Sequence, residues 1–68
     1  MKITKRQREI INLVKSGYQI FVGPSNVMLS KGYDNIYLQE AVFWRMVNNQ
    51  IFYQNPRTNY YELLDSNI

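Results

Sequence analysis

Apolar residues recur with a helical period near the start of the chain. Thr4 and Gln7 have the spacing of a capping box, in which the Thr side chain caps the helix and the Gln reaches back to it. Gly17 stands where a left-handed C-cap belongs. These signals predict a first helix over about residues 5 to 16. Four residues share its broad apolar face: Ile10, Ile11, Leu13 and Val14.

Two short runs rich in β-branched and aromatic residues follow, over residues 18 to 22 and 27 to 31. The Gly-Pro-Ser-Asn sequence between them is a strong turn signal, so we expect a β-hairpin. It has neither the glycine spacing nor the Lys-Ser/Thr ending of a phosphate-binding loop. A second loop is expected over residues 32 to 35, where Asp34 and Asn35 favour the start of the next helix.

A second helix is predicted over residues 38 to 49, and it has two apolar sides. Four residues share one side: Leu38, Val42, Met46 and Asn49. Four lie toward the other side: Glu40, Phe43, Trp44 and Val47. An ordinary surface helix keeps its second side polar. Either this helix is packed between two layers of its own protein, or Glu40, Trp44 and Val47 form an exposed stripe.

The last predicted element is another hairpin. Its strands are expected over residues 51 to 54 and 59 to 64. Pro56 suits position i+1 of the connecting turn, and Asn59 suits the left-handed conformation that such loops often need. Strand alternation places Ile51 and Tyr53 on one face and Phe52 on the other.

The predicted order is therefore helix, hairpin, helix, hairpin, and we expect residues 1 to 68 to form a single small α+β domain. A chain of this length buries only about 60% of its unfolded surface, so its stability margin is expected to be thin. Residues 65 to 68 carry no structural signal, and we expect them to fray.

Residue composition argues against an enzyme. The chain has no cysteine and no histidine, which removes disulfides and the usual thiolate and imidazole metal ligands. Its five carboxylates show no paired spacing that would favour general acid–base catalysis or a metal site. We therefore expect no catalytic residue, no metal and no cofactor.

Charge and hydropathy bear on location and partners. No apolar run approaches the roughly 20 residues needed to cross a bilayer, and the start of the chain lacks the apolar core of a signal peptide. We therefore expect a cytosolic protein with no membrane contact. The bias toward Asn, Ile, Tyr and Lys suits an AT-rich bacterial or phage genome, so the expected cytosol is that of a bacterial host. The net charge of +3 allows a polyanionic partner.

Both ends of the chain resemble the winged-helix domains of small prophage and bacterial regulators. The matching segments are TKRQREIINLVKSGY at the start and AVFWRMVNNQIFYQNPRTNYYEL at the end. Asn48-Asn49, then Ile51-Phe52, then residues 55 to 58 stand where that family has a polar doublet, an apolar pair and the wing. The segment from 20 to 36 departs from the family, which has a helix there where this chain has a β pattern.

The resemblance implies a small winged-helix-like fold for the α+β domain, and a regulatory protein of phage or prophage type that binds nucleic acid, with DNA as the expected ligand. Cations of the first helix would contact phosphates, and Arg57 in the wing could enter a minor groove. The side-chain amides of Asn48 and Asn49 could form hydrogen bonds with the nucleic acid. Tyr53 and Tyr60 flank the wing arginine and could stack on exposed bases of a single strand. Eight residues are candidates for this role: Lys5, Arg6, Arg8, Lys31, Arg45, Asn48, Asn49 and Arg57.

Protein binding is the alternative. Glu40 would repel phosphate, and Trp44 and Val47 cannot read base edges, although all three would face the groove. Trp and Tyr are residue types that anchor protein interfaces. The partner would be a second copy, giving a homodimer, or a host protein blocked by a phage inhibitor of anti-CRISPR or anti-restriction type. Five residues are candidates for this interface: Glu40, Trp44, Val47, Tyr53 and Tyr60.

Overall fold

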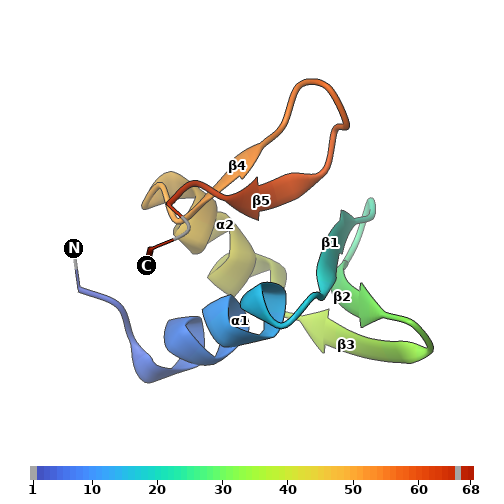
Figure 1. The fold of residues 1–68 in the computed structure, drawn as a ribbon, viewed down its shortest axis with the longest axis horizontal. Coiled ribbons are helices and arrows are strands. Elements are labelled where there is room, and N and C mark those ends of the chain that lie inside the picture. The colour runs from blue at the N-terminus through green and yellow to red at the C-terminus, as the bar shows by residue number, and fades with distance from the viewer. Residues whose placement is uncertain (1, 66) are drawn as a thin grey trace.

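The computed structural model describes residues 2–65 and 67–68, which form a small α+β structure with two helices and one antiparallel sheet (Figure 1). Seven elements follow one another along the chain: α1 (Lys5–Lys15), β1 (Gln19–Val22), β2 (Val27–Lys31), β3 (Asp34–Leu38), α2 (Glu40–Asn48), β4 (Phe52–Gln54) and β5 (Tyr61–Leu63). Within the described residues, no helix is both long and apolar enough to cross a membrane.

The sheet has two parts that meet at a narrow joint. Its strand order is β3-β2-β1-β5-β4, and every neighbouring pair is antiparallel. The meander β1–β2–β3 is paired along its length, whereas β1 and β5 share one register pair, Ile20 with Tyr61. Figure 1 shows the β4–β5 hairpin rising away from the meander beyond that joint.

The strand β3 corrects the predicted order, which had only two strands between the helices. Lys31 pairs with Asp34, so the loop between β2 and β3 is only two residues long, and its first residue, Gly32, has φ +61°. A glycine at that position suits the type II′ turn of tight hairpins. Asp34 and Asn35 therefore belong to a strand and do not start a helix. Both residues are polar and exposed at the start of β3, so this part of the strand resembles a loop in sequence.

The helix α1 agrees with its predicted position. Thr4 Oγ1 accepts a hydrogen bond from the Gln7 amide at 3.1 Å, and Gln7 Oε1 accepts one from the Thr4 amide at 3.2 Å. This is the predicted capping box, and it explains why Gln7 is the one polar side chain buried among the described residues. Gly17 has φ +115°, as the C-cap signal required.

The helix α2 is shorter than predicted, because Leu38 lies in β3, opposite Val27. Its C-terminus has a Schellman motif: the Gln50 amide donates to the Val47 carbonyl at 3.0 Å and the Ile51 amide to the Met46 carbonyl at 2.9 Å. Gln50 takes the left-handed position with φ +62°. The same motif ends α1, with Gly17 in that position.

These two helix ends give a paired stability prediction. Gly17→Ala is expected to lower the free energy of unfolding by about 1 kcal/mol, because a Cβ is strained at positive φ. Gln50→Gly is expected to raise it by about 0.5–1 kcal/mol, since relief of that strain exceeds the added flexibility of the unfolded chain. Urea denaturation of both variants measures the two changes. If both substitutions changed the free energy of unfolding in the same direction, the result would contradict the shared cap geometry.

The hairpin β4–β5 starts differently from its predicted alternation. Ile51 and Phe52 are both buried, because Ile51 belongs to the helix cap and not to the strand. The alternation that placed Ile51 and Tyr53 on one face was therefore wrong. The expectation for Asn59 is confirmed, since its φ is +64°. Arg57 donates its amide to Asn55 Oδ1 at 2.9 Å, a local turn that shapes the hairpin loop.

The core lies between the helices and the sheet. Ten fully or nearly fully buried apolar residues form it: Ile10, Ile11, Ile20, Val27, Leu29, Leu38, Phe43, Met46, Ile51 and Phe52. Ile68 packs partly buried against this cluster, and its carbonyl accepts a hydrogen bond from Arg8 at 2.7 Å. Ser66, in the tail expected to fray, lies outside the described residues.

Candidate functional site

Positive charge is concentrated at the start of the chain. Residues 2 to 15 carry five cations and one acid: Lys2, Lys5, Arg6, Arg8, Lys15 and Glu9. All six side chains are exposed. The remaining residues carry three cations and four acids, so a local charge of +4 stands against −1 elsewhere in the chain. Electrostatic attraction of a polyanion is therefore strongest on and beside α1.

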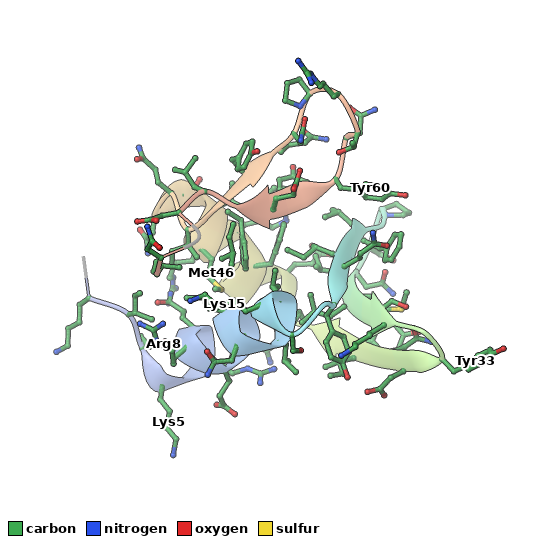
Figure 2. All side chains as sticks on the ribbon, viewed as in Figure 1. Lys5, Arg8, Lys15, Tyr33, Met46 and Tyr60 are labelled. Carbon is green, nitrogen blue, oxygen red and sulfur yellow. The ribbon has the colours of Figure 1, made fainter. Side chains whose placement is uncertain are left out.

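The cations of α1 differ in how they are held. Arg8 is hydrogen-bonded to the Ile68 carbonyl through one guanidinium nitrogen. Lys5 extends from the helix away from the rest of the protein (Figure 2). Arg6 follows Lys5 directly and is also exposed. Lys5 and Arg6 are thus well placed to meet phosphates without first breaking a tertiary contact.

Lys31, another candidate from the sequence, has a structural role. Its Nζ donates to the Ser16 carbonyl at 2.7 Å and lies 5.8 Å from the centre of the Tyr18 ring. A cation at the C-terminus of α1 is favoured by the exposed carbonyls there. Tyr18 donates its hydroxyl to Asp34, and this hydrogen bond to the carboxylate raises the pKa of Tyr18. Lys31 thus helps to join α1 to the meander.

The exposed side of α2 differs from the predicted stripe. Trp44, Arg45 and Asn48 are exposed, with Glu40 at the edge of the same surface. Val47, which one of the two alternatives placed in an exposed stripe with Glu40 and Trp44, packs partly buried against the core. The helix is therefore covered on the Phe43 and Met46 side and open on the other, and this open side mixes aromatic, cationic and amide groups. Asn49, the C-cap residue, is also exposed.

Trp44 is neither fully core nor fully surface. Its ring makes edge contacts with Phe43 at 5.0 Å and Tyr61 at 5.9 Å between centroids. The side chain is still 39% exposed. One edge of the indole therefore extends the core, while the rest is open to solvent or to a partner.

The hairpin loop with Arg57 lies far from the cations of α1. Figure 1 shows the tip of the β4–β5 hairpin and α1 at opposite ends of the molecule. Tyr53 is exposed on β4, whereas Tyr60, labelled in Figure 2, faces the meander and meets Phe21 edge-on at 5.7 Å between ring centroids. The candidate nucleic-acid residues thus form separate groups and not one continuous site.

A cleft that the sequence reasoning missed lies beside the joint of the sheet. It has a volume of about 560 Å³ and lies between the turn end of β1–β2 and the β4–β5 hairpin. Phe21, Met28 and Tyr37 form one wall, because the strand register places them in a row across the meander. Tyr60 lines the opposite side. The alternation of β1 and β2 could have indicated part of this row, but not the hairpin that faces it.

No metal site is evident in the described part of the chain, where no three carboxylates gather. No protein-family model matches the sequence, and no curated protein or solved structure is significantly similar to it. The winged-helix resemblance therefore depends on the sequence motifs alone.

Proposed function

We propose that this protein is a small, non-enzymatic nucleic-acid-binding protein of phage or prophage type, with a regulatory role in the host cytosol. The observation that carries the proposal is the exposed local charge of +4 over residues 2 to 15. Neutralised phosphates release counterions, so clustered and accessible cations provide affinity independent of sequence. The absence of histidine and cysteine supports a binding role over a catalytic one.

The arrangement of α2 and the following hairpin supports a winged-helix-like use of this fold. A helix with Arg45 and Asn48 exposed is followed directly by a hairpin with Arg57 in its loop. Those side chains suit phosphate oxygens and base edges. On a nucleic acid long enough to reach both ends of the molecule, phosphate contacts by Lys5 and Arg6 would supply affinity, and the groups on α2 and the hairpin would supply orientation.

The proposal predicts a steep salt dependence of binding. With about three phosphates neutralised on a single strand, raising monovalent salt about fourfold is expected to weaken binding by about 20-fold. Fluorescence anisotropy with labelled single-stranded and duplex DNA measures this slope. The double variant Lys5→Gln, Arg6→Gln is expected to fold normally and to show a shallower slope. An affinity independent of salt would contradict the proposal.

A second candidate function is protein binding through the open side of α2. The specific observation is the exposed part of the Trp44 ring, next to Glu40 and Asn48. The partner would be a second copy of this chain or a host protein that the chain inhibits. Trp44→Ala tests this candidate, because it would remove the interface anchor while leaving Phe43 in the core.

A further inference from the structure

The cleft beside the sheet joint arises from the way β1 and β5 separate. These strands share the pair Ile20–Tyr61, and past it Val22 and Asn59 no longer pair. The space between them is the cleft of about 560 Å³, within the range of sites that hold small ligands. Phe21 and Tyr60 both line it and meet edge-on, with 5.7 Å between their ring centroids. The cleft is therefore formed by the bend of the sheet where β1 and β5 separate.

Three aromatic side chains from separate strands or loops line the cleft and remain accessible. Phe21 is 37% exposed, Tyr37 66% and Tyr60 44%. An exposed aromatic row on a sheet loses the benefit of burial unless something covers it. Flat rings with free faces favour a flat, aromatic ligand, because stacking gains both area and quadrupole complementarity. In the T-shaped Phe21–Tyr60 pair the edge of one ring covers part of one face of the other, and both side chains still remain exposed.

The polar side chains of the cleft are uncharged amides and tyrosine hydroxyls. Asn26, Gln54 and Asn59 contribute to its lining, and no charged residue does so. Each amide side chain has both donors and an acceptor. Gln54 Nε2 donates to the Asn59 carbonyl at 3.2 Å, which holds the Gln54 side chain at the hairpin end of the cleft. The lining therefore suits an uncharged ring with donors and acceptors along its edge, and it does not suit a phosphate.

We propose that this cleft binds unpaired bases of a single-stranded nucleic acid. A nucleobase is flat, aromatic and uncharged, and it has donors and acceptors at its edge, so it meets each requirement above. Bases of a duplex are stacked and paired and cannot enter. The phosphates of the strand would lie outside the cleft, where Arg57 in the adjoining loop supplies a cation. This inference rests on the proposed nucleic-acid binding and specifies its ligand.

The experiment compares three labelled DNA ligands by fluorescence anisotropy at low salt: a mixed-sequence single strand, its duplex, and an abasic strand of equal length. The abasic strand keeps the phosphates and lacks the bases. The intact strand is expected to bind about tenfold or more tightly than the abasic strand, as loss of one stacked base implies. The duplex is expected to resemble the abasic strand in its affinity per phosphate.

Three variants separate the cleft from general surface effects. Tyr37→Ala is expected to weaken binding of the intact strand about tenfold while leaving the fold unchanged, because Tyr37 is largely exposed. Tyr60→Ala is expected to do the same, with its stability checked by denaturation because it loses the contact with Phe21. Tyr33→Ala is the matched control, since Tyr33 is fully exposed at the β2–β3 turn, away from the cleft (Figure 2).

The outcomes distinguish this inference from the proposed function. If the abasic strand binds as tightly as the intact strand, the base cleft is wrong while nucleic-acid binding stands. The same holds if Tyr37→Ala binds like Tyr33→Ala. If none of the three DNA ligands binds at low salt, both proposals are overturned.

Discussion

Phe43→Ala is expected to lower the free energy of unfolding by about 3–5 kcal/mol, the range for loss of a fully buried aromatic ring. Phe43 is completely buried and lies at the centre of an aromatic cluster. Its ring is 5.0 Å from Trp44, 5.2 Å from Tyr61 and 5.9 Å from Phe52, measured between centroids. The substitution therefore leaves a cavity where α2 meets the hairpin.

This loss approaches the whole stability of the domain. Globular proteins are stable by about 0.05–0.15 kcal/mol per residue, which for this chain is roughly 3–10 kcal/mol. Circular dichroism and urea denaturation measure the change. Arg45→Ala is a matched control on the same helix, because Arg45 is exposed, and it is expected to change stability by about 0.5 kcal/mol or less. A loss below about 1 kcal/mol for Phe43→Ala would contradict the placement of its ring.

Trp44→Ala is expected to lower the free energy of unfolding by about 2 kcal/mol, so that the protein still folds. The value is smaller than for a buried tryptophan because the side chain is 39% exposed and loses only its contacts with Phe43 and Tyr61. Urea denaturation measures this decrease in the free energy of unfolding. Complete unfolding would place Trp44 in the core, contrary to its exposure.

The same variant decides whether Trp44 anchors an interface. Light scattering at two concentrations reports the molar mass of the normal chain and of Trp44→Ala. A homodimer that becomes monomeric in the folded variant would support the protein-binding candidate. Monomers in both cases would exclude a homodimer through this surface and leave a host protein as the partner to test. Tyr33→Ala again serves as the control for an exposed aromatic residue elsewhere.

Local features of the fold were predictable because their causes are local. The capping box of Thr4 and Gln7, the positive φ of Gly17 and the left-handed Asn59 all depend on residues within a few positions in the chain. The hairpin β1–β2 likewise follows from a turn sequence between two β-rich runs. In these cases the nearest neighbours in sequence are also the partners in space.

The strand β3 was missed because its end resembles a loop. Asp34 and Asn35 favour turns and helix starts when considered alone. In the structure Asp34 pairs with Lys31 and Asn35 with Ser30 across a two-residue turn, and the Asp34 carboxylate also accepts a hydrogen bond from the Tyr18 hydroxyl. Strand pairing and a distant tyrosine thus outweigh the local preference. Gln50 is a similar case, because the cap geometry holds it at positive φ although its residue type does not favour it.

The candidate site was predictable in its residue types and much less so in its arrangement. That the cations gather toward the start of the chain is a property of the sequence. The structural use of Lys31, the partial burial of Val47 and the separation of the β4–β5 hairpin tip from α1 depend on elements that meet only in three dimensions.

The sequence by itself determined the first helix and its caps, the turn between β1 and β2, the left-handed Asn59, the charge of +3 and the lack of histidine and cysteine. Only the tertiary structure decided which aromatic rings are covered. Phe43 is fully buried, with Phe52 and Tyr61 packed against its ring. Trp44 is only partly covered, and Phe21 and Tyr60 meet at an open cleft. Periodicity gives the direction of a side chain from its own helix or strand, whereas exposure depends on which distant element packs against it.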